Sequence, residues 1–310
     1  MSPEASPTRP VGPTGSDDEP TLRRCSGVVN DLEFSWLDAG PEDGPLALCL
    51  HGFPDTARGW RRLLPRLAAD GFHAVAPYAR GYAPTAVPED GMSAVASWVA
   101  DACAFHEHLG SGRPGVLVGH DWGALTTYGA ASFAPERWRR VVTMSVPPTT
   151  VMATRMNDYD QIRAFWYQYV FLQPTAEVIV AHDDLVFIER LWQEWSPGFD
   201  PSPEIGSVKD ALRDPSNLSA ALSTYRSMFD LSLQPADLAA QMVAILSTPT
   251  QPTLYLHGAD DGCIAADVVG PTRAQLSAGS RAEAISDAGH FLQYEQPDLV
   301  NDLVVDFLRA

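Results

Sequence analysis

Residues 119–123 read Gly-His-Asp-Trp-Gly and place one carboxylate, Asp121, midway between two glycines. An apolar run too short for a helix, 115–118, precedes this segment, and a helix-compatible run, 124–133, follows it. The pattern predicts a strand, a sharp turn and a helix, in which the missing Cβ atoms allow a strained backbone at Asp121. A carboxylate exposed there suits displacement of a leaving group from saturated carbon, which leaves an ester to be hydrolysed. The simpler interpretation is an aspartate that caps a helix.

A nucleophile needs a base and an acid, and two later segments supply candidates at the ends of expected strands. Strand 253–257 is followed by Asp260 and Asp261, and strand 281–285 is followed by His290. The order nucleophile, acid, histidine is that of the α/β-hydrolase triad. We favour Asp261 as the acid and keep Asp260 as the alternative, since each residue alone could simply belong to a turn.

A fourth segment could stabilise negative charge on oxygen. Residues 51–54, His-Gly-Phe-Pro, follow a continuous apolar run, 46–50, which is typical of a strand buried on both faces. The glycine lets this backbone approach the turn at residues 119–123, so the amides of Phe53 and Trp122 could converge on one oxygen and form an oxyanion hole. A plain turn between a strand and a loop is the alternative.

These segments require a scaffold, and the chain alternates between strands and helices in the way a doubly wound, mostly parallel sheet does. Ligands of such sheets bind at the carboxyl ends of the strands, where Asp121 is expected. A hairpin with a turn at 30–31 precedes the alternation. The remaining expected strands are 25–29, 32–36, 72–77 and 141–145. The expected helices are 56–70, 93–109, 124–133, 235–246, 271–277 and 297–308.

The alternation is interrupted between about residues 147 and 235 by aromatic-rich helical segments without a convincing strand. The expected helices there are 154–172, 175–195 and 209–231. This interruption predicts a helical cap, 148–235, inserted into a core domain formed by 21–147 and 236–310. Residues 1–20 are rich in Pro, Gly, Ser, Thr and acidic residues and are expected to be a disordered leader.

Composition narrows the class of protein. The chain has 310 residues, 45% of them hydrophobic, and a formal net charge of −18, which disfavours binding to nucleic acid or to an anionic membrane. No apolar run approaches the roughly 20 residues that a membrane-spanning helix needs, and the N-terminus lacks a signal-peptide pattern. The four cysteines show no metal-site or disulfide spacing. We therefore expect a cytoplasmic protein without a metal or another cofactor.

Taken together, the motifs resemble the epoxide hydrolases of the α/β-hydrolase fold, with haloalkane dehalogenases as relatives that also use an Asp nucleophile. The resemblance extends over about residues 25–310. It rests on 51–54, on Arg80-Gly81-Tyr82, on 119–124, on the turn at 258–261 and on Gly289-His290-Phe291. One departure is Tyr78, where the family more often has Asp before Arg-Gly-Tyr. The resemblance implies that Asp121 is the nucleophile, His290 the general base and Asp261 its acid partner.

The resemblance also implies two cap tyrosines that hold and protonate the epoxide oxygen. The segments 165–174 and 223–226 resemble the two tyrosine motifs and give these roles to Tyr167 and Tyr225, with Tyr169 as a competitor for the first. Proton donors are needed because expelling an alkoxide from carbon is slow without them. A dehalogenase would be expected to have Asn as a halide donor where this chain has Phe53.

The expected function is therefore hydrolysis of a small apolar epoxide to a vicinal diol by a cofactor-independent enzyme, with water as the second substrate. Phe53, Trp122 and Trp166 are expected to contact the substrate. The alternative for the cap aromatics is that they form the core of the cap. The alternatives are a haloalkane dehalogenase, another hydrolase with an Asp nucleophile, or a ligand-binding member of the fold that lacks catalysis. The protein is expected to be a monomer or a homodimer.

Overall fold

The computed structural model describes residues 9–10 and 22–309. In this part of the chain nine strands form one sheet in the order β1-β2-β3-β5-β4-β6-β7-β8-β9. The pairs β1–β2, β2–β3 and β3–β5 are antiparallel, and all the others are parallel. The strands are β1 (Arg9–Pro10), β2 (Arg23–Val29), β3 (Leu32–Ala39), β4 (Leu46–Leu50), β5 (His73–Pro77), β6 (Gly115–His120), β7 (Trp138–Met144), β8 (Thr253–Gly258) and β9 (Arg281–Ile285).

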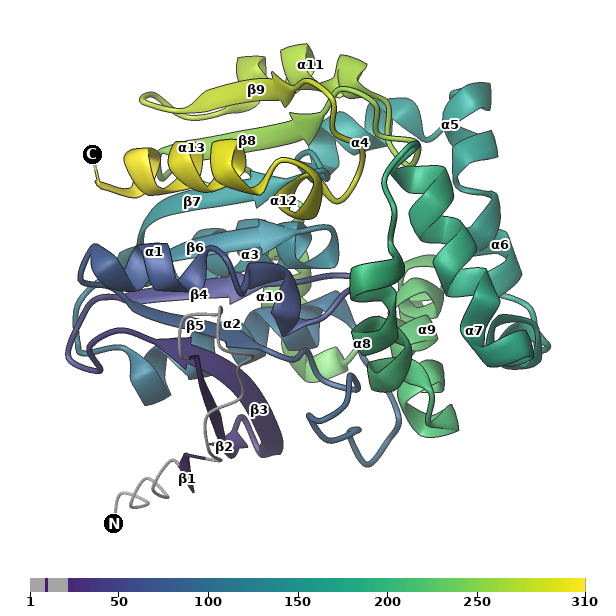
Figure 1. Cartoon of the computed structure of the whole chain (residues 1–310), viewed down its shortest axis with the longest axis horizontal. Coiled ribbons are helices and arrows are strands. Elements are labelled where there is room, and N and C mark those ends of the chain that lie inside the picture. The colour runs from purple at the N-terminus through teal and green to yellow at the C-terminus, as the bar shows by residue number, and fades with distance from the viewer. Residues whose placement is uncertain (1–8, 11–21, 310) are drawn as a thin grey trace.

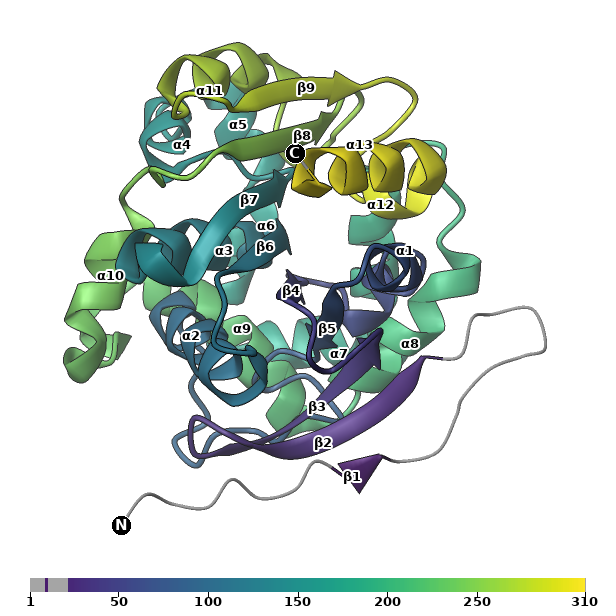
Figure 2. The ribbon, with the colours of Figure 1, turned by 90° about the vertical axis from the view of Figure 1, so that its left-hand side faces the viewer.

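Strands β4, β5, β6 and β8 are buried along their whole length, as their apolar sequences predict, whereas the edge strand β9 is partly exposed. Successive residues of β6 point to opposite sides, so Val116 and Val118 join the core on one face and Leu117 joins the core on the other. Figure 2 shows α1 (Leu64–Ala69), α12 (Leu292–Glu295) and α13 (Pro297–Arg309) on one side of the sheet, and α2 (Val95–Leu109), α3 (Trp122–Phe133) and α10 (Ala239–Ile245) on the other. The predicted doubly wound α/β architecture is confirmed.

The cap is entirely helical and follows β7. In Figure 1 it lies at the end of the sheet toward which the parallel strands point, so it covers their carboxyl ends. Its helices are α4 (Thr149–Arg155), α5 (Tyr159–Ala164), α6 (Trp166–Phe171), α7 (Ala176–Trp195), α8 (Ser202–Leu212) and α9 (Pro215–Phe229). Short 3-10 helices, η3 (Leu231–Leu233) and η4 (Ala236–Leu238), lead back to α10 and the sheet.

Several elements differ from the sequence-based expectations. The expected helix 154–172 is three helices, α4 to α6, and the expected helix 209–231 is α8 and α9, because Asp214 caps a new helix that has Pro215 at its first position. The expected helix 56–70 is a 3-10 helix, η1 (Ala57–Trp60), followed by α1. Helix α7 contains residues with left-handed backbone angles at 183–185.

The start of the chain is consistent with the predicted hairpin. Strands β2 and β3 are joined by Asn30 and Asp31, both at positive φ, which is the conformation of a two-residue hairpin turn. Most of the expected disordered leader, residues 1–20, lies outside the described residues, although Arg9–Pro10 pairs with β2. The other connecting helices of the core are η2 (Pro135–Arg137), η5 (Ala266–Val268) and α11 (Val269–Gln275).

Candidate active site

Asp121 lies at the turn between β6 and α3, with φ 55° and ψ −119°, a conformation that residues other than glycine rarely adopt. The flanking glycines make this turn possible. A Cβ atom on Gly119 would lie 2.2 Å from the carbonyl oxygen of Gly123, and one on Gly123 would lie 2.1 Å from the carbonyl oxygen of Leu50. The strained turn therefore holds the Asp121 side chain above the carboxyl end of the sheet.

The carboxylate of Asp121 is fixed by the segment that follows β4. The amide of Phe53 donates a hydrogen bond of 2.7 Å to Oδ1 of Asp121. A Cβ atom on Gly52 would lie 2.3 Å from this oxygen and 2.5 Å from the amide nitrogen of Trp122, so glycine is needed for this segment to approach the turn. The Phe53 amide can stabilise the charge that develops on Oδ1 when an ester of Asp121 is attacked.

His290 lies between two carboxylates. Its Nδ1 is 3.0 Å from Oδ2 of Asp261, and its Nε2 is 3.6 Å from Oδ2 of Asp121. The other oxygen of Asp261, Oδ1, accepts hydrogen bonds from the amides of Cys263 and Ile264 at 2.7 and 3.0 Å, which fixes the carboxylate. Of the two acids left open by the sequence, the structure brings Asp261 to His290, whereas Asp260 is exposed to solvent.

The electrostatics favour a cationic His290 in the free protein. Burial alone would lower the pKa of this imidazole, but the charge of Asp261 and the hydrogen bonds and charge of the two carboxylates raise it to about 10. Two other histidines nearby behave differently, because burial lowers the pKa of His51 to about 4 and that of His120 to about 3. Only His290 of these three is therefore arranged to gain and lose a proton beside Asp121.

A cavity of about 170 Å³ lies between the cap and Asp121. Most of its wall is apolar. It is lined by Asp121, Trp122, Leu125, Val146, Met152, Met156, Phe165, Tyr167, Gln168, Tyr225, Met228, Phe229, Cys263 and Ile264. Such a wall accepts an uncharged, apolar molecule more readily than a charged one.

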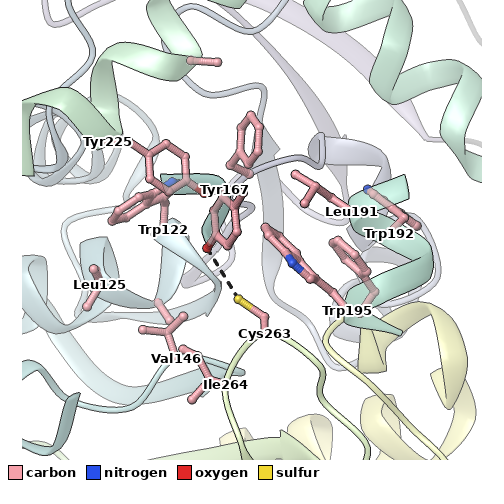
Figure 3. Close-up of a cluster of buried hydrophobic side chains, with 14 of the residues drawn as sticks. Trp122, Leu125, Val146, Tyr167, Leu191, Trp192, Trp195, Tyr225, Cys263 and Ile264 are labelled. Carbon is pink, nitrogen blue, oxygen red and sulfur yellow. Dashed lines mark hydrogen bonds between the residues drawn. The ribbon is translucent and has the colours of Figure 1, made fainter. Parts of the chain in front are cut away.

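Both predicted tyrosines reach this cavity from the cap. Tyr167 on α6 and Tyr225 on α9 are 2% and 1% exposed, and their rings are 5.8 Å apart. Figure 3 shows the Tyr167 hydroxyl directed at Cys263 and Tyr225 beside Trp122. The distance between the Tyr167 oxygen and the Cys263 sulfur is 3.6 Å. Gln168 donates a hydrogen bond of 3.2 Å to the same Tyr167 oxygen. The two phenols thus lie in one cavity with the Asp121 carboxylate.

The chain is similar to known hydrolases in sequence and in fold. The sequence profile of the α/β hydrolase fold matches residues 45–297. The chain is 30% identical to an epoxide hydrolase of Caballeronia sordidicola, over 86% of this chain and 88% of the relative. It is 26% identical to the AB hydrolase superfamily protein YfhM of Bacillus subtilis, over 92% of this chain and 98% of the relative.

A solved structure of an epoxide hydrolase from an endophytic Streptomyces superposes with a TM-score of 0.73 at 26% identity, covering 93% of this chain and 95% of the other. The chain belongs to the epoxide hydrolase family of the α/β-hydrolase fold. In this member of the family, the residues that would contact a ligand come from the core and the cap together.

Sequence reasoning did not identify several residues that line the cavity of this epoxide hydrolase family member. Gln168 and Cys263 both contact the Tyr167 hydroxyl, and three methionines form part of the wall. No motif distinguishes these residues, because only the packing of the cap on the core selects them. The proximity of Cys263 to the predicted acid Asp261 was the one available signal.

Two of the residues expected to contact the substrate, Phe53 and Trp166, do not line this cavity. Phe53 is fully buried, and its ring packs against that of Tyr225 with 5.3 Å between the ring centroids. Trp166 is not among the residues that line the cavity with Asp121, and its side chain is 41% exposed. Its ring packs against Phe187, and its indole nitrogen donates to Glu194 at 3.2 Å on the outside of the cap. Successive residues of an α-helix lie about 100° apart around its axis, so Trp166 does not share the face of α6 that directs Tyr167 inward. Tyr169, the competitor of Tyr167, is 48% exposed and is not among the cavity residues either.

The described residues contain neither a metal-binding cluster nor a membrane-spanning helix. Among residues 9–10 and 22–309, no group of three or more His, Cys, Asp or Glu side chains is arranged to bind a metal ion. None of the helices in these ranges combines the length and the hydrophobicity that crossing a bilayer requires. All four cysteines are buried and none forms a disulfide bond.

Proposed function

We propose that this protein is an epoxide hydrolase, a hydrolase acting on an ether bond, which opens an epoxide to a vicinal diol through an ester on Asp121. One observation carries the proposal: Tyr167 and Tyr225 enter the same cavity as the Asp121 carboxylate. A carboxylate alone can displace a halide, but the alkoxide that leaves when an epoxide opens needs proton donors. Two phenols opposite one carboxylate meet that need.

In the first step, Oδ2 of Asp121 attacks one epoxide carbon, and the bond between that carbon and the ring oxygen breaks. The ring oxygen receives a proton from a phenol and becomes a hydroxyl group of the bound alkyl ester. Oδ1 is held by the Phe53 amide at 2.7 Å, so Oδ2 is the oxygen available for attack. The reacting carbon is held between the carboxylate and the tyrosines, which supplies proximity as well as acid catalysis.

In the second step, His290 removes a proton from water, and the resulting hydroxide attacks the carbonyl carbon of the Asp121 ester. The oxyanion forms at Oδ1 beside the Phe53 and Trp122 amides, and its collapse breaks the bond to the alkoxide. The alkoxide takes the proton of the added hydroxyl and leaves as the diol, which restores the Asp121 carboxylate. The phenolate left by the first step regains its proton from the cationic imidazole. Esterification removes the negative charge of Asp121, one of the two carboxylates that raise the pKa of His290. The neutral imidazole required of a base is therefore favoured after the ester has formed.

The cavity supports a small apolar epoxide as the substrate. Apart from the proposed reacting groups, its wall is built from aliphatic, aromatic and sulfur-containing side chains and Gln168. Apolar substituents gain by leaving water, whereas a charged group would lose its hydration without an oppositely charged partner.

The proposal is tested by trapping the ester. The His290→Gln variant should form the ester but hydrolyse it slowly, so that mixing with a set of epoxides adds the mass of one epoxide to the protein. Peptide mapping should place the addition on Asp121, and Asp121→Asn should show none. Wild-type protein that converts no epoxide, together with a His290→Gln variant that gains no mass, would refute the proposal.

A haloalkane dehalogenase is the second candidate, because the indole Nε1 of Trp122 has no hydrogen-bond acceptor among the described residues and could donate to a halide. This candidate predicts release of chloride or bromide from haloalkanes. The Tyr167→Phe, Tyr225→Phe double variant separates the two candidates. In this variant the rate of epoxide opening should fall by several orders of magnitude. The rate of halide displacement should stay nearly unchanged, since a leaving halide needs no proton.

A further inference from the structure

The backbone of His290 is held by hydrogen bonds from three parts of the fold. Its amide donates to the carbonyl oxygen of Trp195, the last residue of the cap helix α7, at 2.9 Å. Its own carbonyl oxygen accepts from Nε2 of His120 at 2.8 Å and from the hydroxyl of Ser145 at 2.6 Å. The cap therefore contacts the proposed base directly.

The residues on either side of His290 are held by a serine and a glutamate. The amide of Phe291 donates to Oγ of Ser196 at 3.1 Å, and the amide of Gly289 donates to Oε2 of Glu295 at 2.9 Å. The Ser196 hydroxyl donates to Oε1 of Glu295 at 2.7 Å and so joins the two supports. Ser196 directly follows α7 in the cap and is fully buried, whereas Glu295 ends the core helix α12.

The contact between α7 and the core leaves little room for movement. The carbonyl oxygen of Trp195 also accepts from the amide of Gly262, at 3.0 Å, so one cap carbonyl joins the loop of His290 to the loop of the acid Asp261. A Cβ atom on Gly262 would lie 2.1 Å from the carbonyl oxygen of Glu194, and one on Gly289 would lie 2.5 Å from Cα of Ser196. These distances show that glycine is required at both points of contact.

We infer that Ser196 and Glu295 are positioning residues for His290, through which the cap sets the place of the base relative to the Asp121 ester. This inference rests on the proposed function. The two residues touch neither the cavity nor Asp121. They act through hydrogen bonds to the backbone of residues 289–291, and the Glu295 carboxylate adds an electrostatic interaction with His290 and Asp261. Hydrolysis of the ester depends on where Nε2 of His290 lies, because a base must be within hydrogen-bond reach of the attacking water. Formation of the ester depends on Asp121 and the tyrosines and not on this support.

The inference predicts that the two half-reactions respond differently to Ser196→Ala. This change leaves the Phe291 amide and Oε1 of Glu295 without their shared partner in a buried place. We expect hydrolysis of the ester to slow by about tenfold or more, while formation of the ester stays within about twofold of wild type. The ester should therefore accumulate during turnover, as seen by intact-protein mass after rapid mixing with an epoxide that wild-type protein converts.

Two further variants make the experiment specific. Glu295→Gln keeps the size of the side chain but removes an acceptor and the negative charge near His290, so it should slow the same step. It tests the inference if Ser196→Ala does not fold. Ser219→Ala is the matched control, because the Ser219 hydroxyl donates to another carboxylate, Oε1 of Glu177, at 3.1 Å within the cap. Both rates of this control should match those of the wild-type protein.

The outcomes distinguish the inference from the proposed function. Equal slowing of both steps, or normal hydrolysis of the ester in both Ser196→Ala and Glu295→Gln, would overturn the inference while the proposed function stands. A wild-type protein that never forms an ester on Asp121 with any epoxide would overturn the proposed function and the assignment of His290 with it. Selective loss of hydrolysis in the two variants, but not in Ser219→Ala, would support the inference.

Discussion

Nε2 of His290 lies 3.6 Å from Oδ2 of Asp121, so the proposed base already faces the carboxylate whose ester it would hydrolyse. The same proximity couples the protonation of one group to the charge of the other. The imidazole is fully buried and has the Asp261 carboxylate on its opposite nitrogen. Of the two carboxylates beside His290, only Asp121 would lose its negative charge and regain it in each turnover. The pKa of His290 should therefore change with the state of Asp121.

This coupling predicts that Asp121→Asn lowers the pKa of His290 from its value of about 10. The variant removes a charge and an acceptor that favour the cationic imidazole, whereas burial and Asp261 remain. The pKa can be measured by following the histidine ring signals by NMR as the pH is changed. The exposed Asp260→Asn is the control and should leave the titration where it is in the wild-type protein. An unchanged His290 titration in Asp121→Asn would contradict the prediction.

Gln168→Leu should slow formation of the ester by about tenfold and leave its hydrolysis unchanged. Burial raises the pKa of Tyr167 well above its ordinary value, and the hydrogen bond from Gln168 opposes part of that rise. Without this donor, Tyr167 becomes a weaker acid toward the epoxide oxygen. Single-turnover rates of both steps provide the measurement. Gln173→Leu is a matched cap control, because the Gln173 amide donates only to the backbone of Tyr169. Equal rates in wild type and Gln168→Leu would show that Tyr167 does not depend on this bond.

Gly123→Ala should reduce the free energy of unfolding by more than about 3 kcal/mol, because the added Cβ would lie 2.1 Å from a carbonyl oxygen of β4. Gly206→Ala provides the contrast. Gly206 lies within α8, and a Cβ atom there meets nothing within 4 Å, so the higher helix propensity of Ala should add up to about 1 kcal/mol. Urea unfolding of the three proteins measures both effects. Similar stability of Gly123→Ala and wild type would mean that the turn at Asp121 can relax.

Asp55→Asn should make the stability of the protein less dependent on pH. Burial raises the pKa of Asp55 from 3.8 to about 7, against the hydrogen bonds from Tyr294 and Thr56 that lower it. A raised pKa in the folded state contributes stability that is present below 3.8 and is lost as the pH rises through about 7. The unfolding free energy of wild type should therefore fall relative to that of Asp55→Asn over this window. Urea unfolding at about pH 5 and about pH 8 measures the difference. Parallel pH profiles of the two proteins would contradict the prediction.

The sheet and the position of the site could be predicted from the sequence for a physical reason. Asp121, Asp261 and His290 each follow an apolar run, and the carboxyl ends of parallel strands meet at one edge of a sheet. Three residues far apart in the sequence could therefore be brought together without knowledge of any side-chain contact. The choice between Asp260 and Asp261 could not be made with certainty, because it depends on the direction in which one turn leaves β8.

The cap was harder to predict, because weaker sequence signals mark its helix boundaries and its packing. The break at Phe165, between α5 and α6, has no proline or glycine to mark it. Residues 183–185 of α7 adopt left-handed angles although none is glycine, so propensity gives no warning of the kink. Trp166 was placed in the cavity because it is aromatic, whereas the orientation of α6 turns it outward. These features depend on tertiary contacts between the cap and the core.

The carbonyl oxygen of Trp195 accepts hydrogen bonds from the amides of both Gly262 and His290. These two bonds limit which changes in the cap the protein can tolerate. The cap is inserted between β7 and β8, and exchanging such an insertion as a unit would change which substrates fit the cavity. Here the wall of the cavity that comes from α4 to α6 and α9 can change around Tyr167, Gln168 and Tyr225, because none of these helices holds the His290 loop. The end of α7 is more constrained, since Gly262, Gly289 and the His290 amide all fit against it. A foreign cap grafted onto this core should therefore fail to hydrolyse the ester when it replaces residues 194–196, even if it supplies both tyrosines.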